Sequence, residues 1–281
     1  MCYAFGAIEE EEREERMRTV RDKLWLWGHE AGSHNGAYKI PGASRITPAE
    51  AAYYMGMPNV IMVNYRGKPE PPFDQFALAL SPLKRVVWSI VGAGGEQRDD
   101  VSSVIALADR FPNIRGAMMD DFFHGKGGEG KIGTYTPAEL GAVRRQLKAG
   151  GRNLDLWVVL YENQLDFPVS AHLGNCDVLT YWTWLSDRLA NLERDFERAE
   201  RLAPTCRKVL GCYLWDYGNE APMPVDRMER QCEIGRRWLL EGRIEGMAFV
   251  AGCICDLGLE AVEWTRQWVR DVGCEVVDTG E

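Results

Sequence analysis

The sequence has few of the features that mark secreted, membrane-spanning or disulfide-bonded proteins. No run of apolar residues approaches the roughly 18 that a membrane-spanning helix needs. The glycosylation motif Asn-x-Ser/Thr is absent, and the eight cysteines contain no C-x-x-C pair. The acidic run Glu9–Glu15 lies where a signal peptide would be basic and then apolar. We therefore expect a cytoplasmic protein with reduced, buried cysteines and no membrane partner.

Positive charge is also scarce. The chain of 281 residues has 33 Lys and Arg against 42 Asp and Glu, so its formal net charge is −9. Nucleic-acid binding depends on Lys and Arg at the phosphates, so this balance argues against a nucleic-acid partner. Hydrophobic residues make up 46% and charged residues 27% of the chain, as in ordinary globular domains, which excludes disorder.

Short β-branched and apolar runs alternate with helical segments along the whole chain. This alternation indicates βαβ units and a parallel sheet. We predict eight strands: Leu24–Gly28, Val60–Asn64, Arg85–Val91, Ile114–Met119, Leu154–Tyr161, Val178–Trp182, Lys208–Trp215 and Gly246–Ala251. Eight such units predict an α/β fold of the (β/α)8, or TIM-barrel, type, built as a single domain over residues 1–281.

Two helices have clear start signals, in Thr47-Pro48-Ala49-Glu50 and Thr136-Pro137-Ala138-Glu139. In each, Thr can cap the free N–H groups, Pro takes the first helical position and Glu completes a capping box. Further helices are predicted over Arg98–Arg110, Leu185–Leu202, Val225–Glu241 and Leu259–Val272, with about one turn around Ser170–Leu173. The N-terminal extension, residues 1–23, is predicted to add a short amphipathic helix, including Glu9–Arg21, that covers the barrel floor.

Acidic residues follow several predicted strands, where TIM-barrel enzymes carry their chemistry. The predicted catalytic residues are Asp120, Asp121, Glu162 and Asp216. On an extended backbone, adjacent carboxylates face different ways, so one of the Asp pair points to the barrel axis and the other reaches sideways or over the mouth. Burial beside aromatic rings and a like charge raises the pKa of one of them, which then serves as general acid.

Structural roles are the alternative for these acids. Glu162 would then form a salt bridge with Arg66 or Arg85, and one member of the Asp pair would cap the segment that follows it.

Aromatic and polar residues gather at the same strand ends, and ten tryptophans are heavy usage for this length. Flat rings pack against the C–H faces of sugars while neighbouring polar groups bind the hydroxyls, so we expect a carbohydrate substrate and a role in carbohydrate metabolism. No organic cofactor is predicted. The predicted substrate-binding residues are Trp27, His29, Glu30, Asn64, Tyr65, Trp88, Phe122, His124, Tyr161, Tyr181, Trp182, Trp184, Trp215 and Tyr217.

Three histidines, His29, His34 and His124, also fall in predicted strand-end loops. One alternative is therefore a metal-dependent barrel hydrolase or isomerase that uses His29, Glu30, Asp120 and His124. The His-x-His pair of metal-dependent barrel hydrolases is absent from the first strand, so the first interpretation includes no metal. Cys253 and Cys255 are interpreted as thiols that fill the barrel.

The end of the fourth strand resembles that of (β/α)8-barrel glycoside hydrolases. The segment Gly116-Ala117-Met118-Met119-Asp120-Asp121 resembles the strand-four Asp-Asp of the O-GlcNAc hydrolase family of N-acetylglucosaminidases. The resemblance implies that Asp120 holds the acetamido group of the substrate, which acts as internal nucleophile. It also implies that Asp121 is the general acid/base.

A second resemblance is to α-amylase-type barrels. The segment Gly116–His124 matches their pattern Gly-x-x-x-Asp-x-x-x-His, although Met118 stands where an Arg is expected. This resemblance would make Asp120 the nucleophile, Glu162 the acid/base and Asp216 the stabiliser of the transition state. We expect a hydrolase that cleaves an O-glycosidic bond, without assigning a family. A carbohydrate-binding barrel without catalysis is a further alternative.

Overall fold

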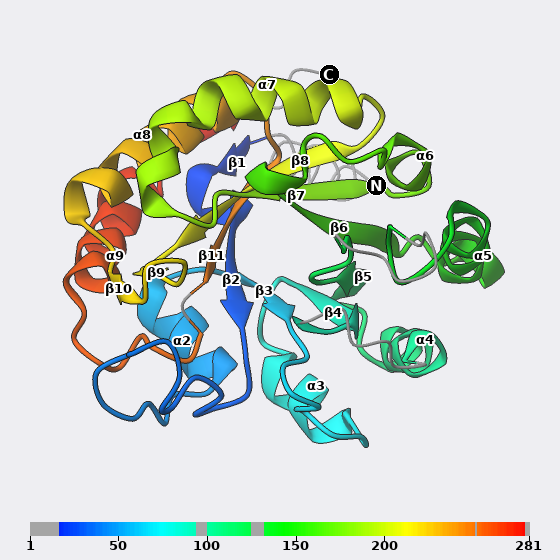
Figure 1. Cartoon of the computed structure of the whole chain (residues 1–281). Helices are drawn as coiled ribbons and strands as arrows, with labels where there is room; N and C mark the ends of the chain where they lie inside the picture. Colours follow the sequence, from blue (N-terminus) through cyan, green and yellow to red (C-terminus); the bar gives the residue numbers. More distant parts are fainter. Residues whose placement is uncertain (1–16, 94–99, 125–131, 251, 279–281) are drawn as a thin grey trace, which may run out of the picture.

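Eight parallel strands form a closed barrel with helices around it (Figure 1). The computed structural model describes residues 17–93, 100–124, 132–250 and 252–278. Around the barrel, the strands follow the order β11-β2-β3-β4-β5-β6-β7-β8, and β11 closes the ring on β2. The predicted (β/α)8 fold is therefore confirmed.

The strands lie close to their predicted bounds. They are β2 Leu24–Gly28, β3 Asn59–Met62, β4 Arg85–Val91, β5 Ile114–Met119, β6 Asp155–Tyr161, β7 Val178–Trp182, β8 Arg207–Tyr213 and β11 Gly246–Val250. The second and seventh predicted strands end two residues early, β3 at Met62 and β8 at Tyr213. The chain leaves the barrel after Tyr213, and β9 Trp215–Asp216 pairs instead with β10 Ala221–Pro222. Ala251, the predicted end of the last strand, lies outside the described residues.

The helices are α2 Pro48–Met55, α3 Asp74–Leu80, α4 Val101–Arg110, α5 Pro137–Lys148, α6 Ser170–Leu173, α7 Leu192–Leu202, α8 Val225–Leu240 and α9 Glu260–Val272. Both predicted capping boxes are present, at Thr47 and Thr136. The start of the helix predicted from Arg98 lies outside the described residues, and α3 has no counterpart in the prediction. The segment predicted as one helix from Leu185 is instead a 3-10 helix, Ser186–Asn191, followed by α7. None of the described helices is long and apolar enough to cross a membrane.

The N-terminal segment differs from its prediction. Residues 1–16 lie outside the description, and the end of the predicted helix is strand β1, Met17–Thr19, followed by the 3-10 helix Val20–Lys23. Strand β1 pairs antiparallel with β12, Val276–Asp278, near the other end of the described chain. The backbone N–H and C=O groups of the two strands hydrogen-bond to each other. A helix over β1 would leave those of β12 without partners, so the predicted helix is wrong here.

The barrel interior is filled by large rings packed over glycines. Trp25 of β2 meets Trp157 of β6 edge to face at 5.0 Å, and Trp27 of β2 meets Trp182 of β7 at 4.9 Å. These strands are not neighbours in the barrel, so the contacts cross its interior. Gly211 of β8 leaves the room that Trp182 occupies. The interior is therefore a packed core that ends below the mouth.

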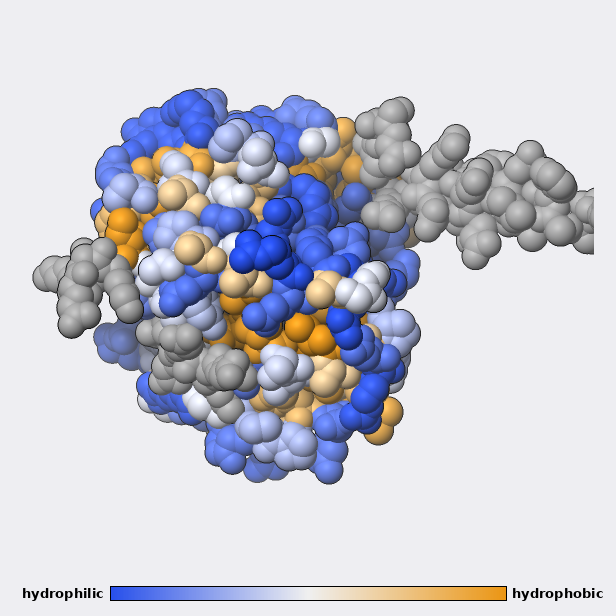
Figure 2. Space-filling model, turned by 90° about the vertical axis from the view of Figure 1, so that its right-hand side faces the viewer, coloured by the Kyte–Doolittle hydropathy of each residue, from blue (hydrophilic) through white to orange (hydrophobic). Residues whose placement is uncertain are grey.

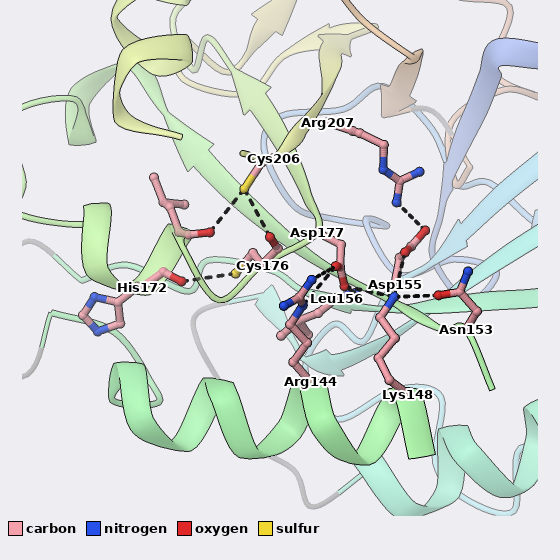
Figure 3. Close-up of polar contacts among 11 residues, drawn as sticks. Arg144, Lys148, Asn153, Asp155, Leu156, His172, Cys176, Asp177, Cys206 and Arg207 are labelled. Atoms are coloured by element: carbon pink, nitrogen blue, oxygen red, sulfur yellow. Dashed lines mark hydrogen bonds and ion pairs between the residues drawn. The ribbon is translucent and has the colours of Figure 1, made fainter. Parts of the chain in front are cut away.

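Ion pairs tie together the strand ends opposite the mouth (Figure 3). The Asp177 carboxylate, just before β7, accepts hydrogen bonds from Arg144 of α5 at 2.7 Å and from the backbone N–H of Leu156 at 2.9 Å. Asp155, which begins β6, pairs with Lys148 at 3.1 Å and with Arg207, which begins β8, at 2.5 Å. This network stabilises the barrel at the end away from its chemistry.

The surface is mostly hydrophilic on the side where α4, α5 and α6 lie, with apolar side chains visible between the polar ones (Figure 2). Helix α6 has only four residues, so it covers the strands beneath it less than its neighbours do.

We predict that Gly211→Ala destabilises the barrel. A Cβ at this position would overlap the indole ring of Trp182, which the surrounding rings prevent from moving. Overpacking of this kind costs about 1–3 kcal/mol, measurable as a lower free energy of unfolding in urea. Gly141→Ala in α5 is the control, because its new methyl group would meet only the ends of polar side chains. An equal effect of both changes would contradict the packing argument.

Candidate active site

A pocket opens at the carboxyl ends of the barrel strands. Nine of the predicted site residues line it: Trp27, His29, Tyr65, Asp120, Asp121, Tyr161, Trp182, Trp184 and Tyr217. Five further lining residues were not among the predicted site residues: His34, Tyr38, Ala93, Tyr213 and Val250. The structure thus brings acids and aromatic rings from the predicted strand ends into one place.

Asp120 and Asp121 both reach this pocket. Asp120 directly follows β5 and is buried, and its Oδ1 accepts a hydrogen bond from the backbone N–H of Asp121 at 2.9 Å. Asp121 has a φ of +43°, in the left-handed region. Adjacent side chains on an extended strand point to opposite faces, and the left-handed residue breaks this alternation. Two consecutive carboxylates can therefore serve the same cavity.

The two carboxyl groups have different surroundings. Burial, together with the charge of Asp121, raises the pKa of Asp120 well above its ordinary value. Asp121 is only partly buried, and its Oδ1 accepts a hydrogen bond from the Tyr161 hydroxyl at 2.7 Å. Burial also raises the pKa of Tyr161 well above its usual value, so its hydroxyl keeps its proton and can donate. Loss of the Asp120 proton is therefore disfavoured.

Tyr213 joins this group through a hydrogen bond between its hydroxyl and that of Tyr161. Its ring lies 5.0 Å from that of Trp182. The strand was predicted to end at Trp215, but β8 ends at Tyr213. The residue at the mouth of the barrel is therefore Tyr213, which the sequence prediction missed.

Aromatic rings form one wall of the pocket. Trp182 packs edge to face on Trp27, and Trp184 stacks on Tyr217 with ring centroids 6.3 Å apart. Tyr161 meets Trp184 edge to face at 6.2 Å. Such a wall offers apolar contact to a ring-shaped ligand next to the carboxyl pair.

A cluster of tyrosines and histidines adjoins this wall through Tyr217. His34 Nδ1 lies 3.1 Å from the Tyr217 hydroxyl, and the Tyr65 hydroxyl donates to that of Tyr38 at 3.2 Å. The sequence places His34 and Tyr38 six and ten residues after the end of β2. Only the folded path of this long loop brings them back over the barrel.

Glu162 lies outside the pocket lining. Its Oε2 accepts a hydrogen bond from the backbone N–H of Trp184 at 2.9 Å, and Arg188 lies 4.0 Å from Oε1. Burial raises the pKa of this carboxyl, against the effect of the hydrogen bond from Trp184. The ion-pair partner is thus Arg188, whereas the structural alternative named Arg66 or Arg85. Glu162 positions Trp184 in the wall.

Asp216 also lies outside the lining. Its Oδ2 accepts hydrogen bonds from the Ser186 hydroxyl and, at 2.9 Å, from the Asn219 side chain. Its Oδ1 accepts from the backbone N–H of Asn219 at 3.2 Å. Asp216 therefore holds the turn that carries Tyr217.

Seven predicted binding residues are not part of the lining: Glu30, Asn64, Trp88, Phe122, His124, Tyr181 and Trp215. The period of two along a strand explains several of them. Tyr181 precedes the inward-facing Trp182, so it points outward and packs on Phe196 of α7. Trp88 likewise packs on Phe73, which precedes α3.

The four residues of the metal-dependent alternative are not brought together. His29 and Asp120 line the pocket, whereas Glu30 lines a separate recess beside α2 and α3. His124 Nε2 lies 3.3 Å from the Thr134 hydroxyl.

Comparison with known proteins supports the fold. No protein-family model matches the chain, and no curated protein does either. A GH2 β-galacturonidase from Eisenbergiella tayi is similar in structure, with a TM-score of 0.56 and 11% identity over 91% of this chain and 52% of that one. The GH113 β-mannanase AaManA from Alicyclobacillus acidocaldarius has a TM-score of 0.52 and 11% identity over 91% and 98% of the two chains.

A tryptophan synthase complex from Pyrococcus furiosus matches with a TM-score of 0.50 and 11% identity, over 91% of this chain and 99% of that one. At identities this low, the structural similarity shows only the barrel fold, which glycosidases share with other enzymes. The activity must therefore be argued from the site.

We predict that Asp120→Asn makes the protein more stable above neutral pH. The folded-state pKa of Asp120 is raised, so between the ordinary value of about 4 and that raised value the unfolded chain releases a proton that the folded chain keeps. Rising pH therefore favours unfolding of the wild type through this group, and Asn removes the effect. The thermal midpoint of the variant should exceed that of the wild type above neutrality, and the gain should fade towards the ordinary aspartate pKa.

Asp166→Asn is the control for this comparison, because Asp166 is exposed and should show no such pH-dependent gain. Equal midpoints of Asp120→Asn and wild type at every pH would contradict a raised pKa at Asp120.

Proposed function

We propose that the protein is a glycosidase that cleaves an O-glycosidic bond at the mouth of the barrel. One observation carries the proposal: Asp120, which is buried and has a raised pKa, lies beside Asp121 in a pocket walled by aromatic rings. Glycoside hydrolysis needs a proton donor for the leaving oxygen and a carboxylate near the charge that develops on the sugar. Glycosidases among the similar structures support this reading at the level of the fold.

Asp120 is the proton donor in this proposal. Its proton is retained because burial and the neighbouring charge make ionisation costly. Asp121, which accepts a hydrogen bond from the Tyr161 hydroxyl, is the partner that binds the substrate. These roles are the reverse of those implied by the resemblance to the O-GlcNAc hydrolase family.

The nucleophile would come from the substrate. Among the described residues of the lining, Asp120 and Asp121 are the carboxylic acids, since Glu162 and Asp216 are bonded elsewhere. A 2-acetamido sugar can supply its own nucleophile, as some glycosidases require. We therefore propose an N-acetylhexosaminide as substrate, and the three-acid arrangement of α-amylase-type barrels receives no support from this geometry.

The proposed reaction has two steps. The acetamido oxygen attacks the anomeric carbon while the bond to the leaving oxygen breaks and Asp120 gives its proton to that oxygen. Asp121 accepts a hydrogen bond from the acetamido N–H and stabilises the positive charge that grows on the ring. Water then attacks the anomeric carbon, the Asp120 carboxylate takes its proton, and the acetamido group is restored.

Kinetics with aryl N-acetylhexosaminides of both anomeric forms should separate the two aspartates. With a poor leaving group, Asp120→Asn and Asp121→Asn should each lower kcat/KM by about 10²–10⁴-fold. With a leaving group so acidic that it needs no proton, Asp120→Asn should recover most of the rate, and Asp121→Asn should not.

Glu162→Gln is the comparison variant and should stay within about tenfold of wild type, because its carboxylate only positions Trp184. Recovery by Asp121→Asn in place of Asp120→Asn would restore the roles implied by the family resemblance. Binding of sugars without turnover of any of these substrates by the wild type would instead favour a non-catalytic carbohydrate-binding barrel.

A further inference from the structure

A second group of reactive side chains, two of which line the same pocket, has no part in the proposed hydrolysis. It consists of His29, which follows β2, His34 in the next loop, and Cys253, which follows β11. One ring nitrogen from each histidine and the Cys253 sulfur all lie within 4.8 Å of one another. All three side chains are buried.

The backbone brings two of these residues together by close contact of neighbouring strands. Strands β2 and β11 are paired, and beyond them the Gly252 N–H donates to the Trp27 carbonyl at 3.1 Å. A Cβ on Gly252 would lie 2.8 Å from the Cα of Gly28, so glycine here permits the approach. His29 and Cys253 follow directly on these two glycines, and His29 Nδ1 lies 3.8 Å from the Cys253 sulfur.

The loop that carries the third residue is also held in place. The Asn35 side chain bonds both backbone groups of Ser44, accepting from its N–H at 2.8 Å and donating to its carbonyl at 3.1 Å. This bridge closes the loop next to His34, whose ring lies 4.5 Å from that of His29. The Tyr217 hydroxyl bonded to Nδ1 then orients the His34 ring.

The separation between His29 and Cys253 is close to that of two ligands on a tetrahedral ion. Zn–S and Zn–N bonds of about 2.3 and 2.05 Å, at tetrahedral angles, separate sulfur from nitrogen by about 3.6 Å. The observed separation of 3.8 Å needs only a small contraction.

The protonation states also suit metal binding. Burial lowers the pKa of His29 well below its ordinary value and that of His34 to about 4, so both imidazoles are neutral and offer a lone pair. Burial raises the pKa of Cys253 to about 12, while backbone N–H groups, including that of His34, point at its sulfur. On binding, the thiol would release its proton to solvent, and these N–H groups would stabilise the thiolate.

We propose that His29, His34 and Cys253 bind one Zn²⁺ ion at the wall of the pocket. Two imidazoles and a thiolate are soft or borderline ligands, which favour Zn²⁺ over Mg²⁺ or Ca²⁺. Three protein ligands leave a fourth position of the tetrahedron for a water molecule or a ligand in the pocket. The site differs from the sequence-based metal alternative, in which Cys253 had no part. It does not rest on the proposed glycosidase activity.

Cobalt titration of the whole chain, stripped of metal with chelator, tests this site without any substrate. Co²⁺ takes zinc sites and absorbs in the near ultraviolet when a thiolate binds it. We expect this absorption to grow to one equivalent of Co²⁺ and to vanish when one equivalent of Zn²⁺ is added. Cys253→Ser should abolish the absorption, whereas Cys232→Ser, which alters a buried thiol in α8, should leave it unchanged.

His34→Gln keeps every thiol and provides the second test. This change should lower the affinity for Co²⁺ by more than about 100-fold, because it removes a ligand. Tyr217→Phe removes only a hydrogen-bond partner of that ligand, so it should lower the affinity by about 10- to 100-fold and keep the absorption. Circular dichroism of each variant reports whether the barrel is folded. No thiolate absorption in the wild type, its survival in Cys253→Ser, or unchanged binding in folded His34→Gln would each overturn the site.

Discussion

The pocket depends on the way Trp182 fills the barrel. Its ring lies across the interior against Trp27, in the space that Gly211 leaves open on the neighbouring strand. Parallel barrels are packed cores, so a cavity exists only above the last layer of side chains. Trp182 belongs to that layer, and the carboxyl pair and the aromatic wall are arranged above it. A smaller side chain here would deepen the cavity and leave the rings around it without support.

The chemistry of the pocket arises from a local departure from regular strand geometry. If Asp121 continued β5 as an extended residue, it would face away from Asp120. The left-handed backbone at Asp121 costs about 1 kcal/mol or somewhat more, although Asp tolerates this region better than most residues. The hydrogen bonds from the Asp121 N–H to Asp120 and from Tyr161 to Asp121 offset part of that cost. Their result is two carboxyl groups in different surroundings: that of Asp120 is buried, and that of Asp121 is partly buried and bonded to the Tyr161 hydroxyl.

The mouth of the barrel thus has two chemically distinct sides. The carboxyl pair follows β5 and Tyr161 ends β6, whereas residues after β2 and β11 supply neutral imidazoles and a thiol. The carboxyl pair, Tyr161 and the two histidines line one pocket, so a bound molecule can meet both sides. In the sequence, Glu162 and Asp216 resemble a third and a fourth catalytic acid. In the structure, Glu162 holds Trp184 in the aromatic wall, and Asp216 holds the turn that carries Tyr217. Buried carboxylates of this kind stabilise a site without touching what it binds.

The sequence by itself determined the barrel and several of the strand-end residues that line the pocket. Apolar runs buried on both faces, as in Leu156–Leu160, and capping boxes such as that at Thr136 depend on residues near each other in the chain, so their pattern is visible without the fold. The same local signal identified Asp120, Asp121 and Trp182 as strand-end residues. The side chains that point inward depend on the alternation of side chains along each strand and on the residue at which the strand ends. Because β8 ends two residues before its predicted end, Tyr213 lies at the mouth in place of Trp215.

Contacts between distant segments were decided by the tertiary structure alone. His34 and Cys253 are 219 positions apart, and only the closure of β11 on β2 brings them together. The pKa of Asp120 likewise follows from burial by residues of several strands, which no local pattern contains. The segment before β2 became a strand because β12, from the other end of the described chain, offered it a partner. Local chemistry thus predicted the elements, and barrel closure decided which of their side chains meet.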